Sequence, residues 1–416
     1  MSQNQRHLLI LACLSHALCH AYMLIFPVVL GLIKQQYGFS FLGVGTVGMV
    51  AYFCFGLGAI PAGLLIDKVG PKRMLTIGLF GMALASLSIG LTPSVAFMML
   101  AIFALGCFAS IHHPAALAMI SMMTLQRKGI AFGTHAVAGS VGLAAAPFIT
   151  GVLLSQFNWR YPYLLFALLG LMAAVFSLQL PTPEATERRA PGSPKLDAPP
   201  GPTSPAYAYL IFVTLCVASA LFGLVYRGTL TYFPTLFAQN SAALNGSYLW
   251  IGSLTGLILA VGAIGQFYGG VISDRLKTKA HGTLGIFIMS APLLVGIGMT
   301  RGVTQLVLCG LLSMLVFTFQ PIQNHIIADA TKRHRRGVAY GVNYGLLFGF
   351  GSFAASAGGW VIDQHGVHAI YICMGGIAVL AAGAVAAQLV LSRQDALPTV
   401  NLGLDPLQAE AEVARR

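Results

Sequence analysis

Twelve apolar runs, each long enough to cross a lipid bilayer as a helix, constrain the fold of this chain more than any other feature. They lie near 8–33, 41–66, 74–92, 95–122, 129–155, 162–180, 207–236, 247–272, 283–299, 304–328, 337–362 and 368–392. A bilayer-spanning helix needs roughly 17 to 25 mostly apolar residues. In lipid the backbone must satisfy its own hydrogen bonds, which a helix does within one segment. The sequence therefore predicts an all-α membrane protein with twelve transmembrane helices, whose main partner is the lipid bilayer.

The charged residues are few, and their distribution indicates orientation. Only 8% of the 416 residues are charged, whereas soluble domains carry roughly a quarter. Apart from Arg227, inside a run, the lysines and arginines fall on one side of the predicted array, except Lys34, Arg160 and Arg301. By the positive-inside rule both termini are cytoplasmic. The net charge of +12 thus reflects topology, and we expect no nucleic acid as a partner.

One polar segment divides the runs six against six. Residues 181–206 are rich in proline and poor in large apolar side chains, so they cannot bury a core and predict a cytoplasmic linker. We expect an N-terminal six-helix bundle at 1–180, a C-terminal bundle at 207–392 and a cytoplasmic tail at 393–416. The chain has no convincing nucleophile elbow, phosphate loop or deep pair of acids, so we expect neither an enzyme nor a cofactor.

The two halves of the chain repeat. A shift of 207 residues aligns Pro27 with Pro234 and Pro114 with Pro321, and a shift of 208 aligns "KGIAFG" (128–133) with "RGVAYG" (336–341). A nearly constant offset over so long a stretch indicates a duplicated six-helix unit. Parallel repeats of this kind place a substrate site near the bilayer midplane, between the halves. The prediction is two pseudo-symmetric six-helix bundles around a central cavity.

The loop after the second run carries a recognisable motif. Residues 63–73 read "GLLIDKVGPKR", and 270–279 read "GVISDRLKTK", a degenerate copy. The first resembles the signature between helices 2 and 3 of the major facilitator superfamily, and the resemblance spans nearly the whole chain. It implies a transporter that alternates between inward-open and outward-open states. The gating residues expected from these two motifs are Gly63, Asp67, Lys68, Gly70, Lys72, Arg73, Gly270, Asp274 and Arg275.

Three further motifs are similar to one branch of that superfamily, the branch of the fosmidomycin resistance efflux protein. They are "LSH" in the first run, "IHHP" in the fourth and the glycine pattern of the fifth. This resemblance implies efflux. We also expect a cytoplasmic (inner) membrane location and a monomer. The branch has acidic residues where this chain has His20 and Ala115. The fifth run also matches an antiporter signature at Gly142 and Pro147, but has Ala146 and Thr150 where that signature has glycine.

Polar side chains inside the runs mark the expected site, because such groups are costly in lipid and face the interior. The candidates for substrate binding or coupling are His16, His20, His112, His113, His135, Arg227, Gln320, Asn324 and Asn343. Prolines expected to bend helices beside them are Pro27, Pro114, Pro147, Pro234 and Pro321. His16 and His20 share a helix face. Because His112 and His113 are adjacent, and so about 100° apart, we expect only one of them to face the cavity.

These residue types indicate the chemistry. No Asp or Glu lies deep in a run, so histidine is the available proton carrier, and Arg227 favours an anionic substrate. We therefore expect a secondary transporter of a small, anionic or polar organic molecule, with proton-coupled efflux as the leading mode. One alternative is a transition metal or metal chelate bound by His16, His20, His112 and His113. Others are a non-transporting membrane assembly factor, and histidines that only pack between helices.

Overall fold

The computed structural model describes residues 3–123, 128–180, 205–240, 247–276, 278–331 and 336–394. Its described residues contain twelve helical spans long and apolar enough to cross a membrane. This confirms the predicted fold class. The predicted linker at 181–206 and the predicted tail at 393–416 lie almost wholly outside the described residues. Only 205–206, at the start of α10, and 393–394, at the end of α16, are described.

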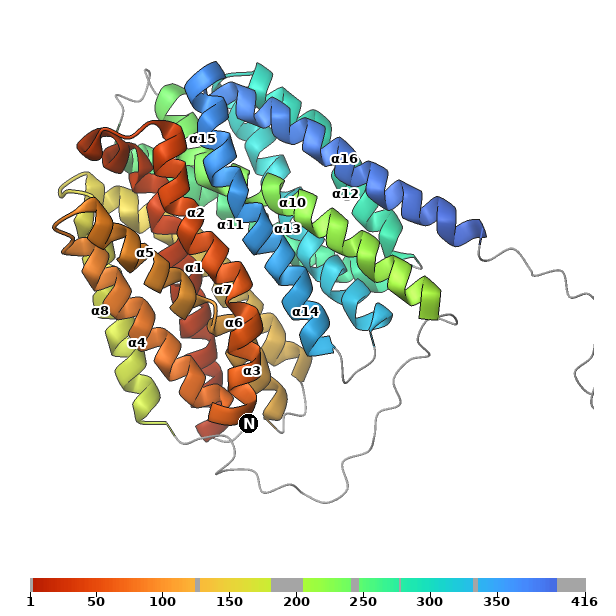
Figure 1. The fold of residues 1–416 in the computed structure, drawn as a ribbon, viewed down its shortest axis with the longest axis horizontal. Helices are drawn as coiled ribbons and strands as arrows, with labels where there is room; N and C mark the ends of the chain where they lie inside the picture. Colours follow the sequence, from red (N-terminus) through yellow and green to blue (C-terminus); the bar gives the residue numbers. More distant parts are fainter. Residues whose placement is uncertain are drawn as a thin grey trace, which may run out of the picture.

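Helices α1 to α8 form the first half, and α10 to α16 the second (Figure 1). The first half contains α1 (Gln3–Tyr37), α2 (Phe41–Leu57), α3 (Ala59–Val69), α4 (Pro71–Gly90), α5 (Val95–Ala109), α6 (His112–Met122), α7 (Lys128–Leu154) and α8 (Arg160–Leu178). The second contains α10 (Pro205–Asn240), α11 (Tyr248–Arg275), α12 (Lys279–Met299), α13 (Gly302–Ala330), α14 (Arg336–Tyr344), η3 (Gly345–Gly349), η4 (Phe350–Ser352), α15 (Phe353–His365) and α16 (Val367–Gln394). Helix α1 packs against α7, α8 and α6 of its own half and against α10 of the other.

Three of the spans are interrupted, two of them just before a proline. Helix α2 ends and α3 begins around Gly58, three residues before Pro61, and α5 gives way to α6 at 110–111, just before Pro114. A proline has no N–H to donate to the carbonyl four residues earlier, so the helical ladder is weakened there. Four other predicted bending prolines, Pro27, Pro147, Pro234 and Pro321, lie inside helices that continue past them.

The third interruption lies in the eleventh span, predicted as one run at 337–362. Helix α14 passes into a π-helical turn, η3, and then into the 3-10 turn η4 before α15 resumes. The segment η3 packs on α2 and α10, so it lies between the two halves. Single π-helical turns of this kind occur often at functional sites.

The ends of the bundle are distinguished by their turns. Gly38 and Gly366, both with positive φ, connect spans at one end, here named the Gly38 end, and Gly70 (φ 90°) connects α3 to α4 at the opposite Gly70 end. Only glycine adopts such φ values without strain. The N-terminus lies at the Gly70 end (Figure 1).

The backbones of the two halves touch at the Gly38 end. A Cβ added to Gly45 would lie 2.1 Å from the Ala355 carbonyl oxygen, and one added to Gly359 would lie 2.2 Å from the Phe41 carbonyl oxygen. Backbones therefore touch there, across α2 and α15. Towards the Gly70 end the approach is looser, since a Cβ on Gly63 would meet no atom within 4 Å. This arrangement closes the interior from the Gly38 side.

Candidate functional site

Five histidines from three helices gather in the first half, and we name them the histidine cluster. His16 lies at the centre, with ring centroids 4.1 Å from His135, 4.8 Å from His20, 4.9 Å from His112 and 5.1 Å from His113. Helix α1 supplies His16 and His20, the start of α6 supplies the adjacent pair, and α7 supplies His135. The structure thus brings together all five histidines singled out in the sequence.

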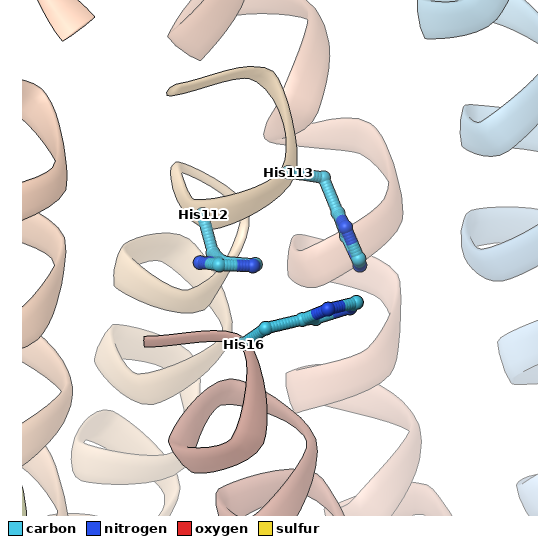
Figure 2. Close-up of side chains that lie close together, drawn as sticks. All are labelled: His16, His112 and His113. Atoms are coloured by element: carbon cyan, nitrogen blue, oxygen red, sulfur yellow. The ribbon is translucent and has the colours of Figure 1, made fainter. Parts of the chain in front are cut away.

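Both members of the adjacent pair reach the histidine cluster, although only one of them was expected to face the cavity. Both rings lie against His16: His112 stacks on it at 22° and His113 meets it edge-on at 84°. Figure 2 shows the His16 ring beneath the other two. Side chains about 100° apart on one helix can converge when the neighbouring ring lies between their two directions. Position along a helix does not reveal where that neighbour is.

Hydrogen bonds orient the rings. The Nδ1 atom of His16 lies 2.7 Å from the His135 carbonyl oxygen, which can only accept, so His16 carries its proton on Nδ1. In the neutral ring, Nε2 is then an acceptor, and it receives the bond from His20 Nε2 at 3.0 Å. His112 Nδ1 is bonded to Ser15 Oγ at 2.8 Å. The Nε2 atoms of His112 and His113 are buried and have no hydrogen-bond partner among the described residues.

Arg227 lies on α10 and is 3% exposed. Its guanidinium carbon sits 3.7 Å above the ring of Tyr52 in α2, so the contact joins the two halves. The Tyr52 hydroxyl donates to the Met23 carbonyl oxygen in α1 at 2.9 Å. The Nε and Nη1 atoms of Arg227 have no partner within the described part of the chain. Helix α10, which carries Arg227, packs against α1, which carries His16 and His20, so the arginine and the cluster lie on neighbouring helices.

The second half reaches the cluster through aromatic rings. The His113 ring is nearly parallel to the rings of Tyr344 and Phe348, with centroids 6.3 Å and 6.4 Å away. The Tyr344 hydroxyl donates to the side-chain oxygen of Asn324 at 2.7 Å. The predicted residue Asn324 therefore connects to the cluster through Tyr344, at the junction of α14 with the π-helical turn.

The other predicted amides form separate networks. Asn343, Ser219 and Gln323 bond to one another inside the second half. Gln320 receives a bond from Gln266 at 3.3 Å, and Gln266 receives one from Ser140 of the first half at 2.5 Å. Asn343 and Gln320 thus belong to bonded interhelical networks, with Gln320 linked to a contact between the halves.

The predicted gating motif at 63–73 lies around the Gly70 end. A Cβ added to Gly63 would meet no atom within 4 Å, whereas one added to Gly56 would lie 2.1 Å from the Gly349 backbone nitrogen. Lys72 is buried at the start of α4, whereas the charged side chains of Lys68 and Arg73 are exposed. The side chain of Asp67 lies outside the described residues.

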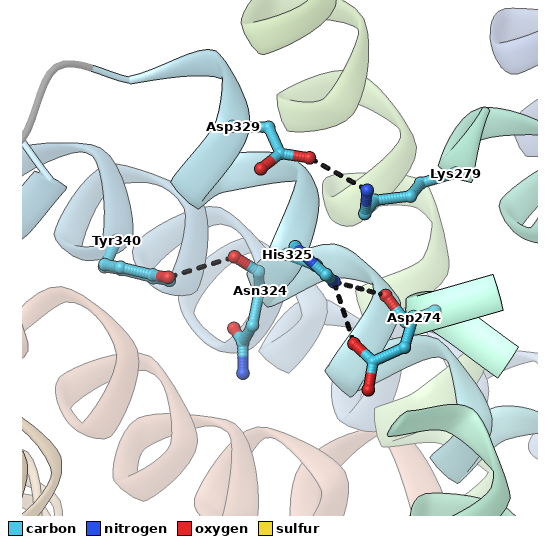
Figure 3. Close-up of polar contacts among 7 residues, drawn as sticks. Asp274, Lys279, Asn324, His325, Asp329 and Tyr340 are labelled. Atoms are coloured by element: carbon cyan, nitrogen blue, oxygen red, sulfur yellow. Dashed lines mark hydrogen bonds and ion pairs between the residues drawn. The ribbon is translucent and has the colours of Figure 1, made fainter. Parts of the chain in front are cut away.

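The second predicted gating motif makes its polar contacts within its own half (Figure 3). Asp274 faces His325 of α13 with an oxygen-to-Nδ1 distance of 3.8 Å, and Ser273 bonds the same nitrogen at 2.9 Å. Arg275, the last residue of α11, is exposed, and Gly270 has no atom within 4 Å of an added Cβ.

Three residues at the site were missed from the sequence: Ser15, Tyr52 and Tyr344. Ser15 directly precedes His16, and Tyr344 directly follows Asn343. Both could have been found as neighbours of polar residues within an apolar run. Tyr52 has no such signal, because tyrosine is common in apolar runs and its role depends on Arg227 in another helix.

Twelve spans in two halves, with polar groups gathered between them, define a polytopic membrane carrier. The model of the Major Facilitator Superfamily matches residues 11–356. An uncharacterized MFS-type transporter, YfnC, of Bacillus subtilis is 23% identical over 382 residues, covering 90% of each chain. The fosmidomycin resistance protein of Escherichia coli is 22% identical over 366 residues, covering 86% of this chain and 87% of that one.

The fold also matches solved structures. A bacterial homolog of the human lysosomal transporter Spinster, in an inward-facing and occupied conformation, superposes with a TM-score of 0.73 at 15% identity, covering 93% of this chain and 97% of that one. The chain belongs to the Major Facilitator Superfamily. It is a multi-pass membrane transporter and not an enzyme, and the predicted resemblance to the superfamily is confirmed.

Proposed function

We propose that this protein moves a small organic anion across the membrane by alternating access, and that Arg227 binds the anionic group. The observation that carries the proposal is the state of this side chain. Its guanidinium is 3% exposed and lies between the halves, and two of its nitrogens have no hydrogen-bond partner among the described residues.

The energetics favour an anionic ligand. A guanidinium stays charged in proteins, and a buried charge without a partner costs several kcal/mol. The ring of Tyr52 offsets about 0.5 to 2 kcal/mol of that cost through its cation–π contact. The free nitrogens form part of a planar fork that matches carboxylate, phosphonate and phosphate groups. An organic anion would therefore supply the missing hydrogen bonds.

The position of Arg227 suits alternating access. Arg227 belongs to the second half, and Tyr52, on which it rests, belongs to the first. When one half of a transporter rocks against the other, a site at their boundary is exposed to each side in turn. The closure at the Gly38 end supports an arrangement in which access comes from the Gly70 side.

Topology, direction and energy source belong to the same proposal. We propose that the Gly70 end and both termini are cytoplasmic, from the distribution of lysine and arginine, in an inner membrane and in a monomer. Export is supported by the fosmidomycin resistance protein among the relatives, and proton coupling by histidine as the proton carrier available inside the spans. In proteoliposomes an imposed pH gradient should drive anion flux, and flux that ignores the gradient would contradict proton coupling.

Substitution of Arg227 tests the proposal. Purified protein should be stabilised by organic anions, screened as phosphonates and aromatic carboxylates in a thermal-shift assay. Arg227→Lys keeps the charge but loses the planar fork, which is worth about 1.5 to 3 kcal/mol for hydrogen bonds to charged groups. Affinity should therefore fall roughly ten- to hundredfold, and further in Arg227→Gln.

Arg160 provides the matched control. It also stacks on an aromatic ring, that of Trp159 at 4.6 Å, but at the start of α8 and away from the boundary between the halves. Arg160→Lys should leave anion affinity unchanged. Equal affinity in the wild type, Arg227→Lys and Arg227→Gln would remove Arg227 from the site.

A further inference from the structure

The three histidines His16, His112 and His113 each direct a ring nitrogen towards a common space (Figure 2). One ligand atom from each lies within 4.8 Å of the other two. We infer that these residues form a binding site for a late-transition divalent ion such as Zn²⁺. The inference goes beyond the proposed anion transport and does not depend on it, because none of its ligands is Arg227.

The distances are close to those that a metal requires. Tetrahedral Zn²⁺ holds imidazole nitrogens at about 2.0 to 2.1 Å, which places neighbouring ligand atoms roughly 3.3 Å apart. Ligand atoms that are at most 4.8 Å apart therefore need to move together by about 1.5 Å or less. Rotation of three side chains supplies that movement without a shift of the helices.

The hydrogen bonds around the site engage the Nδ1 atoms of two of the rings. His16 donates from Nδ1 to the His135 carbonyl oxygen, and His112 Nδ1 is bonded to Ser15 Oγ. Metal-binding histidines commonly bond their other ring nitrogen to a carbonyl or a polar side chain, which fixes the ring and its tautomer. The lone pair on His16 Nε2 accepts only the bond from His20, and the Nε2 atoms of His112 and His113 lack any partner among the described residues.

Packing alone explains this arrangement poorly. An unsatisfied buried polar atom costs about 1 to 3 kcal/mol, and His112, with 1% exposure, and the neighbouring ring each present one. A metal ion satisfies both atoms at once. Of the bonds between the rings, only that from His20 to His16 Nε2 would be displaced, and His20 is then placed to become a fourth ligand.

The donor set selects the class of ion. Imidazole suits zinc, copper, nickel and cobalt, whereas magnesium and calcium prefer oxygen. Neutral imidazoles leave the charge of the ion uncompensated, and Arg227 on the neighbouring helix α10 adds a further positive charge. A small anion as the fourth ligand, in place of His20, would reduce that repulsion.

The test is a metal titration of the purified full chain carrying an affinity tag without histidine. Co²⁺ serves as the probe, because its visible absorption reports tetrahedral nitrogen ligation, and competition with Zn²⁺ gives the zinc affinity. We expect saturation at one ion per chain. His113→Gln and His112→Gln should each lower the affinity at least tenfold, and His16→Gln together with His113→Gln should abolish saturable binding.

His368 provides the matched control, since it lies in α16, outside the cluster, and its buried Nε2 also has no partner among the described residues. His368→Gln should leave the titration unchanged. The variant His113→Gln should still fold, because the replaced Nε2 makes no hydrogen bond with the described residues. A wild-type protein without saturable binding, or equal affinity in the wild type and the double variant, would overturn the inference.

Arg227→Gln separates this inference from the proposed function. It should lose anion affinity and keep the Co²⁺ spectrum and the stabilisation by Zn²⁺, since a ligand that binds only the folded state raises stability. Loss of the spectrum in Arg227→Gln alone, with the histidine variants unaffected, would place the metal elsewhere and so overturn the inference. Metal binding without any anion affinity in the wild type would contradict only the transport proposal.

Discussion

At the scale of the residue, Tyr52 supports the buried charge of Arg227. Its ring lies 3.7 Å beneath the guanidinium carbon of Arg227, and its hydroxyl bonds the Met23 carbonyl oxygen. The ring and the hydroxyl can be removed separately. The ring contacts Arg227 of the second half, whereas the hydroxyl hydrogen-bonds α2 to α1 within the first half.

We predict that Tyr52→Phe and Tyr52→Leu differ in anion binding. Phenylalanine keeps the aromatic face, so the affinity for the organic anion should change less than about threefold. Leucine removes a cation–π contact worth about 0.5 to 2 kcal/mol, so the affinity should fall roughly two- to thirtyfold. The thermal-shift titration used for Arg227 measures both. Equal losses in the two variants would assign the effect to the hydroxyl and contradict the cation–π account.

At the scale of the element, Asp363 joins α15 to the start of α2. Its two carboxylate oxygens accept the backbone N–H groups of Phe41 and Leu42 at 2.9 and 2.8 Å. The first N–H groups of a helix have no partner within the helix and carry partial positive charge. The carboxylate therefore fastens the two halves together at the Gly38 end.

We predict that Asp363→Asn weakens this closure without unfolding the protein. The residue is exposed, so the lost charge–dipole term is about 0.3 to 1 kcal/mol, which shifts the equilibrium between open and closed states roughly two- to fivefold. Labelling of a cysteine engineered between the halves at the Gly38 end should become faster by that factor. Asp329→Asn is the control, because Asp329 pairs with Lys279 at 3.0 Å within the second half (Figure 3).

At the scale of the whole molecule, backbone contact between the halves stabilises the state seen here. Gly45→Ala would bring a Cβ to 2.1 Å from the Ala355 carbonyl oxygen, whereas at Gly31 of α1 an added Cβ meets nothing within 4 Å. We predict that Gly45→Ala increases labelling at the Gly38 end and that Gly31→Ala does not. Both are helical glycines, so any gain in helix propensity is shared. Unchanged labelling in Gly45→Ala would show that the halves need not touch there.

The sequence repeat places polar residues with different contacts at equivalent positions of the two halves. His135 of the first half corresponds to Asn343 of the second at a shift of 208 residues. In the structure His135 stacks in the histidine cluster, whereas Asn343 bonds with Ser219 and Gln323. Equivalent places in the two bundles thus hold polar interior groups with different chemistry.

The sequence by itself determined the features of the protein that depend on local composition. Spans follow from runs of apolar residues because lipid excludes unsatisfied backbone groups, and the sequence predicted all twelve. Polar side chains within spans face inwards for the same reason, so the histidines and Arg227 were identifiable one by one. The superfamily motif at 63–73 could likewise be recognised directly in the sequence.

Only the tertiary structure decided which of these groups meet. His16 and His20 were predicted to share a face, but His112, His113 and His135 join them through the packing of α1, α6 and α7. The partner of Arg227 is Tyr52, on a helix of the other half, and the tight glycine contact lies at Gly56 instead of Gly63. Hydropathy specifies that a side chain is inside, since that is a property of one helix and its solvent. Distances between side chains on different helices depend on how those helices pack, which no single segment encodes.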